Sequence, residues 1–271
     1  MTGRRDRGAR LGRVLAPAAV FVLGLAAWEA IVQLLGIQFY LLPAPSAIAR
    51  TLEDNAAFLI TAAWYTGQEA LLGFGIGCGL GILVAAGSVR WRAVADALLP
   101  YSIAANSVPI IALAPLAIVW FGVEQGSKIA IVAMMTFFPA LVGTIRGLCS
   151  PDPTAFDLMR SYGASERQVF LRLRLPAAMP FVFTALKVSA SLSMIGAVVG
   201  EFFGGFARSL GVYIISQTAL FHTREAWGAI VVACAFGIAA YLCIVGAERL
   251  LSRGTWRCAG DRGGITARGR V

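Results

Sequence analysis

Long apolar runs alternate with short polar segments along most of the chain. A helix that crosses a bilayer needs about 20 consecutive, predominantly apolar residues, and six of the runs are long enough. They predict spans at 15–36, 68–88, 97–120, 129–146, 178–200 and 226–247. The expected fold class is therefore all-α, an integral membrane protein with six transmembrane helices.

The basic residues are distributed unevenly between the predicted loops. Eighteen of the 23 lysines and arginines fall in the two ends of the chain and in the second and fourth loops. Four others, Arg50, Lys128, Arg208 and Arg224, fall on the opposite side. Because cytoplasmic loops carry the excess of positive charge, both termini are expected in the cytoplasm.

Three regions follow from this map. Residues 1–13 form a basic cytoplasmic N-terminus, 14–250 a six-span domain with a cytoplasmic loop at 147–177, and 251–271 a Gly/Arg-rich tail expected to be disordered. The chain is 58% hydrophobic and 14% charged, with a net charge of +9. Membrane topology accounts for that charge, and no nucleic-acid-binding motif is present. The bilayer of a bacterial plasma (inner) membrane is the expected location.

The charge-dense segment 152–180 predicts two short helices outside the membrane. Asp152 followed by Pro153 is typical of a helix start, and Gly163 supplies a left-handed cap. Ser165 and Gln168 then form a capping box that starts a second helix. Pro176 is expected to end this helix at Leu175. Such a pair cannot span a bilayer and suits a docking surface.

The spacing of Asp157, Gly163, Leu173, Leu175 and Pro176 resembles the cytoplasmic signature of importer-type ABC transporter permeases. Asp157-Leu158-Met159 stands where that family most often has Glu-Ala-Ala. The resemblance implies contact with a separate ATPase through Asp157, Leu158, Met159, Tyr162, Gly163, Ala164, Phe170, Leu173, Leu175 and Pro176. The alternative is a basic amphipathic segment lying on the anionic inner leaflet, which would not require the fixed glycine-to-Leu-Pro distance.

The resemblance extends over most of the chain. The stretches LLPAPSAIARTL, VPIIALAPLAIVWFG and GAVVGEFFGG are similar to permeases of the nitrate, sulfonate and taurine importer group, and within it to the branch that imports pyrimidine thiamine precursors or riboflavin-like compounds. The family implies a homodimer, two cytoplasmic ATPase subunits that bind the ATP, and an extracytoplasmic substrate-binding protein. The sequence alone is equally compatible with a heterodimer.

Candidate pathway residues lie around two prolines of the third predicted span. Pro109 and Pro115 interrupt helical hydrogen bonding, and broken helices often line transport routes. Asn106 and Ser107 beside the first break are then candidate lining residues; a kinked packing helix is the alternative. Glu201, at the outer end of the fifth span, either faces the pathway or is solvated.

Two further charged groups fall within apolar runs. Glu29 is interpreted as an outer-interface residue held by a polar neighbour, with a pathway or gating group as the other reading. A stand-alone secondary carrier with Glu29 as its ion-coupling group is the functional alternative. Lys187 either extends its ammonium to the interface, which we favour, or pairs inside the bundle.

Glycines spaced by four in the second span predict close helix packing. Gly73, Gly77 and Gly81 form one row, and Gly75 and Gly79 form another. In the first outer loop, Ser46 is expected to cap an amphipathic helix that continues through Ile48, Leu52 and Leu59.

Motifs for catalysis are missing from the sequence. It contains no P-loop, nucleophile elbow, paired catalytic carboxylates or metal-ligand spacing. We therefore expect no enzyme activity and no cofactor or metal in this chain. A transport subunit that depends on other chains for energy and ligand capture fits this pattern, and its substrate would be a small organic or inorganic solute.

Overall fold

The computed structural model describes residues 3–89 and 91–252, and all regular structure in these residues is helical. The elements are α1 (Gly3–Leu34), α2 (Pro45–Asp54), α3 (Ala56–Ser88), α4 (Arg92–Asn106), α5 (Ile110–Phe121), α6 (Gln125–Leu148), α7 (Pro153–Ser161), α8 (Glu166–Val169), the π-helix η1 (Phe170–Arg174), α9 (Leu175–Phe202), α10 (Leu210–Ala219) and α11 (Thr223–Ser252). The predicted tail 251–271 lies outside the described residues after Ser252.

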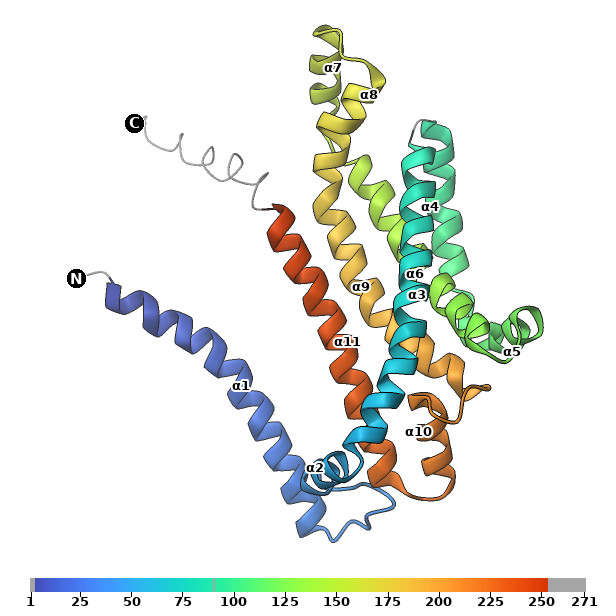
Figure 1. Ribbon diagram of the computed structural model, residues 1–271. Helices are drawn as coiled ribbons and strands as arrows, with labels where there is room; N and C mark the ends of the chain where they lie inside the picture. Colours follow the sequence, from blue (N-terminus) through green and yellow to red (C-terminus); the bar gives the residue numbers. More distant parts are fainter. Residues whose placement is uncertain (1–2, 90, 253–271) are drawn as a thin grey trace.

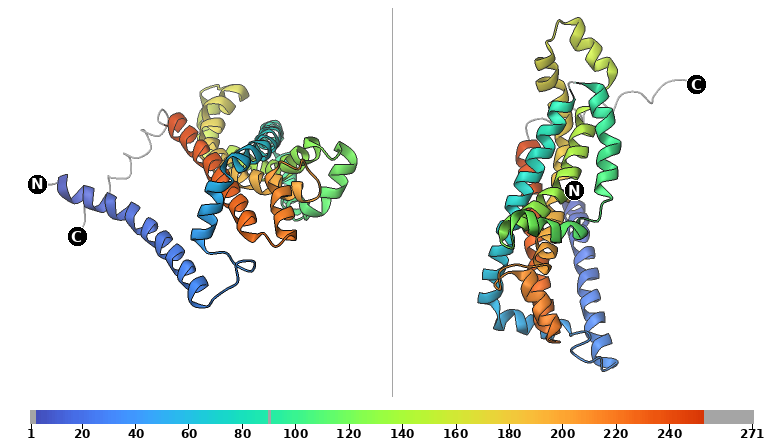
Figure 2. Two further views of the ribbon diagram at one scale, coloured as in Figure 1. Left: turned by 60° about the horizontal axis from the view of Figure 1, so that its bottom comes forward. Right: turned by 90° about the vertical axis from the view of Figure 1, so that its right-hand side faces the viewer.

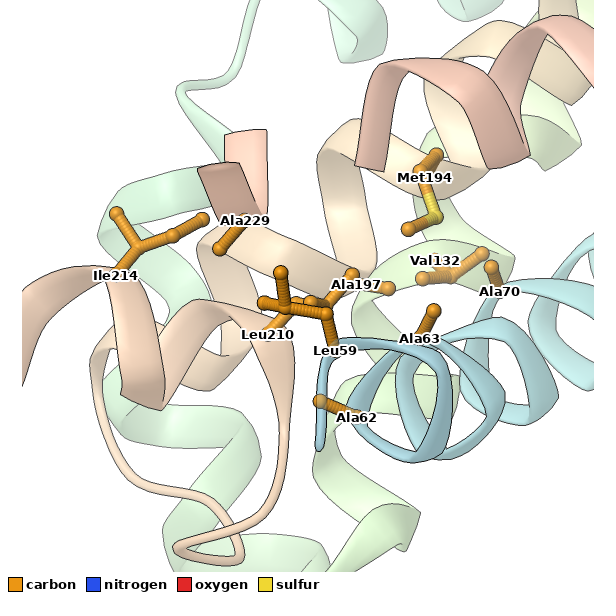
Figure 3. Close-up of a cluster of buried hydrophobic side chains, with 10 residues drawn as sticks. All are labelled: Leu59, Ala62, Ala63, Ala70, Val132, Met194, Ala197, Leu210, Ile214 and Ala229. Atoms are coloured by element: carbon orange, nitrogen blue, oxygen red, sulfur yellow. The ribbon is translucent and has the colours of Figure 1, made fainter. Parts of the chain in front are cut away.

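Helices α3, α6 and α9 form the centre of a bundle, and α11 packs beside α9 (Figure 1). Their shared core contains many alanines, which let the backbones approach closely. Figure 3 shows the largest cluster, made of Leu59, Ala62, Ala63, Ala70, Val132, Met194, Ala197, Leu210, Ile214 and Ala229. Four helices besides α3 contribute to this cluster, so it joins the bundle centre to α10 and α11.

The first glycine row lies at the contact between α3 and α6. A Cβ atom placed on Gly81 would lie 2.7 Å from the carbonyl oxygen of Phe137, and Gly73 and Gly77 approach α6 in the same way. The prediction of close packing is confirmed for this row. A Cβ on Gly75 or Gly79 would meet nothing within 4 Å, so the second row does not pack against another described helix.

Helix α1 stands apart from the bundle along most of its length in both sets of views (Figures 1 and 2). Val20 and Phe21 are 71% and 68% exposed. Near its C-terminal end α1 meets α11 through Trp28 and Trp227, whose rings lie edge to face at 5.2 Å. An apolar helix with so few contacts in its own chain needs lipid or another subunit around it.

Within the described residues, four helical stretches have the length and hydropathy of a membrane span: Ala56–Ser88, Gln125–Leu148, Glu166–Phe202 and Thr223–Leu251. Ala97–Ala105 and Ile110–Phe121 would together make a fifth, but they are bent by 87° at their junction. The third predicted span is therefore not one straight helix. Ala18–Leu34 is a shorter apolar helix at the position of the first predicted span.

The start of α2 differs from the sequence prediction. Ala44 is the N-cap residue and Pro45 opens the helix, so Ser46 already lies in the first turn. Proline suits this position because the first helical N–H has no intrahelical partner. The expectation that Ser46 caps this helix is wrong, and Leu59 belongs to α3 rather than to α2.

Candidate functional site

Helix α7 begins where the sequence predicts. The Asp152 carboxylate accepts a hydrogen bond of 2.8 Å from the Thr154 backbone N–H, and Pro153 follows the cap. This hydrogen bond favours the ionised carboxylate and lowers the pKa of Asp152 from its ordinary value. The helix start is thus stabilised by a charged cap at neutral pH.

Gly163 ends α7 in the left-handed conformation, with φ of +71°. The Ala164 N–H donates to the Met159 carbonyl at 3.0 Å, and the Gly163 N–H donates to the Arg160 carbonyl at 2.9 Å. These two bonds define a Schellman motif, which requires the positive φ that glycine adopts without strain. The predicted helix-ending glycine is confirmed.

The capping box of α8 is also confirmed. The Gln168 N–H donates to the Ser165 hydroxyl at 3.4 Å, and the Ser165 N–H donates to the Gln168 side-chain oxygen at 2.8 Å. Helices α7 and α8 are therefore separate elements joined by a short turn that starts at Gly163.

The prediction that Pro176 ends the second helix at Leu175 is wrong. Helix α8 continues through η1 directly into α9, so a single helical rod runs from Glu166 to Phe202. Within η1 the Leu175 N–H donates to the Phe170 carbonyl, five residues earlier. Pro176 lies in the first turn of α9, directly after this wider π-turn. Single π-turns occur inside α-helices and let the helix continue past a local irregularity such as a proline. Helix α8, η1 and α9 consequently form one continuous helix.

The two helices of this pair, residues 153–174, contact each other at the end that is nearest the bundle. The Arg174 guanidinium lies 4.9 Å from the centre of the Phe156 ring, a cation–π contact between η1 and α7. Phe170 packs against a cluster formed by Val89, Leu148 and Ala178. The helix pair is thus rooted in the ends of α3, α6 and α9.

The tip of the helix pair presents apolar side chains to solvent. Tyr162 is 83% exposed and Leu158 is 57% exposed, and both belong to α7 or its cap. Asp157 and Gly163 are exposed as well, whereas Met159, Ala164, Phe170 and Leu173 are half-buried. Leu175 and Pro176 are exposed on the rod below. We call the surface around Leu158 and Tyr162 the docking face; the two helices lie at one extreme end of the molecule (Figure 1).

Among the candidate pathway residues, Asn106, Ser107 and Pro109 lie at the bend between α4 and α5. Pro109 is the N-cap of α5, and the Ser107 hydroxyl donates to the Ile103 carbonyl at 3.3 Å. Pro115 lies inside α5 without breaking it. The side chain of Asn106 lies outside the described part of the structure. The sequence prediction of a break at Pro109 is confirmed, and a pathway role for these residues stays a prediction.

Glu201 lies in a buried polar cluster at the opposite end of the bundle from the helix pair. Its side chain is 1% exposed, so it is not solvated. Its two carboxylate oxygens accept hydrogen bonds from the Thr66 hydroxyl at 2.7 Å and from the Gly211 N–H at 2.6 Å. The Thr66 hydroxyl in turn accepts from the Leu210 N–H at 3.0 Å. Glu201 therefore joins α9 to α3 and to the start of α10.

Sequence reasoning missed three members of this cluster. Thr66 and Glu69 come from α3, and Lys128 comes from α6, where its side chain is fully buried. The Lys128 ammonium donates to the carbonyls of Val123 and Glu124. An acidic residue inside the apolar run 68–88 was the available signal, because a carboxylate in a membrane helix is expensive unless it faces polar groups.

Comparison with known proteins assigns the chain to a family. A family model described as "Binding-protein-dependent transport system inner membrane component" matches residues 77–257. The chain belongs to this family. Because that family consists of transport components, the chain is a permease subunit of an ABC importer and not an enzyme.

Curated relatives support this assignment over the length of the permease. The formylaminopyrimidine transport permease protein ThiX of Halalkalibacterium halodurans is 32% identical over 88% of this chain and 95% of its own length. The riboflavin transport system permease protein RibX of Chloroflexus aurantiacus is 30% identical, with 88% of both chains covered. The putative aliphatic sulfonates transport permease protein SsuC of Bacillus subtilis is 29% identical over 87% of this chain and 84% of its own. These relatives match the importer group expected from the sequence.

The fold of the permease is also found in a solved structure. A chain of the MetNI methionine ABC transporter in an inward-facing conformation is similar with a TM-score of 0.50, over 79% of this chain and 98% of that one. The sequence identity is 19%, so this likeness concerns the fold alone. The all-helical, importer-type permease fold expected from the sequence is confirmed.

Glu29 and Lys187, two charged residues within predicted apolar runs, both contact polar or charged side chains. The Glu29 carboxylate accepts from the Gln33 side chain at 2.6 Å and from the hydroxyl and N–H of Ser46 at 2.7 and 3.0 Å, which ties α1 to α2. The interpretation of Glu29 as a residue held by polar neighbours is confirmed. Lys187 lies 2.6 Å from Glu248 of α11, and the two side chains are 21% and 26% exposed, so its ammonium has a carboxylate partner. Glu248 directly follows the last predicted span, so an ammonium extended to the interface stays a prediction.

Proposed function

We propose that this permease forms the translocation pathway of an ABC importer as a homodimer, with two cytoplasmic ATPase subunits and an extracytoplasmic substrate-binding protein. The chain holds no cofactor in this proposal, since ATP is bound by the ATPase. The observation that carries the proposal is the continuous rod from Glu166 to Phe202, which connects an exposed docking surface to the middle of the bundle.

The docking face would contact the ATPase. Leu158 and Tyr162 are large apolar side chains exposed at the tip of α7, and burying them against another protein is favourable. Asp157 beside them is exposed and adds a charge for recognition. Lipid would satisfy apolar side chains too, but the helix pair extends beyond the ends of α3 and α6 (Figures 1 and 2).

Motion of the ATPase would reach the membrane through α9. The cation–π contact between Arg174 and Phe156 and the packing of Phe170 keep α7 and α8 together at their base. Because no break separates η1 from α9, a displacement of the docking face would tilt α9 directly. The two subunits would then rock between inward-open and outward-open forms.

The arrangement of the ends supports six spans with cytoplasmic termini. The turn between α3 and α4 lies toward the same end of the molecule as the helix pair, and α2 and α10 lie at the other end (Figure 1). These two groups are the segments whose arginine content predicts a cytoplasmic and an outer location, respectively. Helix α1 and the bent pair α4–α5 would supply the two spans besides the four long helices.

The substrate we propose is a small solute of the kind that the relatives carry, a heteroaromatic vitamin precursor or a sulfonate. The relatives are named for formylaminopyrimidine, riboflavin and aliphatic sulfonates. Pathway contact with such a solute would involve Asn106, Ser107 and the backbone freed at the bend before Pro109, with Pro115 further along, inside α5. Glu201 would not contact the solute; its hydrogen bonds would hold α9 and α10 in position.

Uptake by reconstituted vesicles tests the proposal. Vesicles would contain the permease alone, the permease with its ATPase and binding protein, or the same complex with an ATPase unable to hydrolyse ATP. Uptake of labelled formylaminopyrimidine, riboflavin or an alkanesulfonate is expected only in the complete, active complex. Uptake by the permease alone under an ion gradient would instead support a secondary carrier, and would contradict the proposed coupling.

A further inference from the structure

A groove lies between the helix pair and the ends of the membrane helices. Its volume is about 1080 Å³, and it is lined from the α3–α4 turn, the end of α6 and the helix pair. The lining combines arginines with aromatic and apolar groups, notably Val89, Trp91, Phe156, Arg167, Phe170 and Arg174. Leu158 and Tyr162, the apolar side chains of the docking face, do not line it, and Asp157 is the residue that borders both surfaces.

The groove lies at the height where the apolar helices end. Helix α3 ends at Ser88 and α6 at Leu148, and the residue that follows each of them, Val89 and Cys149, lines the groove. Arg174, the last residue before α9, lines it as well. In a membrane this height corresponds to the boundary between acyl chains and headgroups. The exposed Trp91 fits that boundary, where tryptophan is enriched.

Two arginines face the groove from one side of the rod. Arg167 and Arg174 are seven residues apart with Phe170 between them, all on elements that run continuously into α9. Arg174 stacks on Phe156, and no described carboxylate lies within ion-pair distance of either arginine. Both guanidinium groups are therefore available to bind an anion, and their geometry suits a phosphate.

The acidic residues of the groove leave its net charge positive. Asp157 and Glu166 line it along with Arg160, Arg167 and Arg174. Glu166 lies 3.9 Å from Arg160, an exposed pair. The surplus positive charge therefore belongs to the side formed by Arg167 and Arg174.

We propose that this groove holds the headgroup of an anionic phospholipid of the inner leaflet, with Arg167 and Arg174 on its phosphate and Trp91 and Phe170 against its glycerol region. This proposal rests on the cytoplasmic orientation of the helix pair in the proposed function. The lipid would fill the space between the rod and the bundle. It would thereby support the position of the rod while the docking face remains free for the ATPase.

Lipid retention by the assembled transporter tests the proposal. The full complex would be placed in nanodiscs of phosphatidylcholine with phosphatidylglycerol, and the retained lipid would be counted by native mass spectrometry. Replacing both arginines (R167Q and R174Q together) is expected to lower phosphatidylglycerol retention roughly thirtyfold, since each basic residue near an anionic surface contributes about 1 kcal/mol. The matched control, R50Q with R208Q, removes two exposed arginines elsewhere and should retain lipid as the unaltered chain does.

Two results would overturn the proposal. The first is unchanged phosphatidylglycerol retention by the R167Q/R174Q variant. The second is loss of the ATPase from that variant with lipid retention intact, which would place the arginines in the protein interface. Failure of uptake in the reconstituted system bears on the proposed function and leaves lipid retention measurable.

A second readout does not depend on the arginine variant folding. Brominated phosphatidylglycerol should quench the fluorescence of Trp91, measured as the difference between the unaltered chain and W91F, more strongly than brominated phosphatidylcholine does. Equal quenching by the two lipids would contradict selective binding of an anionic headgroup in this groove.

Discussion

The hydroxyl of Thr66 donates a hydrogen bond of 2.7 Å to the carboxylate of Glu201, a residue 135 positions later in the chain. The same hydroxyl accepts from the Leu210 N–H, and the second Glu201 oxygen accepts from Gly211. One threonine and one glutamate thus satisfy two backbone groups at the start of α10. In an apolar bundle such groups are costly when they have no partner.

Replacing Thr66 by valine is expected to destabilise the permease. Valine keeps the shape of threonine but leaves the Leu210 N–H and one Glu201 oxygen without their partner, at a cost of roughly 1–3 kcal/mol. Serine keeps the hydroxyl, so T66S is the control and should lose much less. The measurement is the midpoint of thermal unfolding in detergent; equal midpoints for T66V and T66S would show that the hydrogen bonds do not matter for stability.

Replacing Gly163 by valine should uncouple the ATPase without preventing membrane insertion. A Cβ on Gly163 would meet nothing within 4 Å, so the penalty arises only from the left-handed backbone, roughly 1–2 kcal/mol for a residue with a side chain. Asparagine tolerates this conformation better, so G163N is the control. The assay is substrate-stimulated ATP hydrolysis by the reconstituted complex. Normal stimulation in G163V would argue against a role for the α7–α8 turn in coupling.

The two glycine rows of α3 predict opposite effects for the same substitution. A Cβ on Gly81 would lie 2.7 Å from the Phe137 carbonyl oxygen, so G81A should force α3 and α6 apart and cost roughly 1–3 kcal/mol. Gly79 has open space around it, so G79A should be neutral or stabilising by up to about 1 kcal/mol through helix propensity. Thermal unfolding of the two purified variants decides this, and a G81A protein as stable as G79A would contradict the packing described.

The pair formed by Lys187 and Glu248 should show energetic coupling between α9 and α11. The two charged groups are 2.6 Å apart, with side chains 21% and 26% exposed. Removing one charge leaves the other poorly solvated, so K187M and E248Q should each cost more than half of what the double variant costs. A double-mutant cycle on unfolding should give a coupling of roughly 0.5–3 kcal/mol. Strict additivity of the two single changes would mean that the ion pair contributes nothing.

The features of the helix pair that the sequence predicted are local. Asp152 caps a backbone group two residues away, and Ser165 and Gln168 bond each other across three residues. Gly163 adopts its positive φ for a turn that involves only its neighbours. Such interactions depend on residue type and spacing alone, so the sequence contains all the information that they require.

The prediction at Pro176 failed for a reason that sequence spacing does not show. The rule that a proline disfavours helix in the residue before it assumes regular α-helical geometry. Here the five residues of η1 are wound more loosely, and the helix passes through Leu175 and Pro176 into α9. Packing of Phe170 on the bundle accompanies this geometry, and that packing involves residues from three different helices.

The sequence alone determined the long apolar runs, the uneven distribution of basic residues between the predicted loops, the two short helices of the helix pair and the family resemblance. Only the tertiary structure decided which polar side chains pair with one another, because Glu201 is distant in the chain from Thr66, and Lys187 from Glu248. It also decided the 87° bend between α4 and α5 and the continuity of α9 with the helix pair. Local propensities act over one or two helical turns, whereas the pairing of buried polar groups depends on which helices pack together.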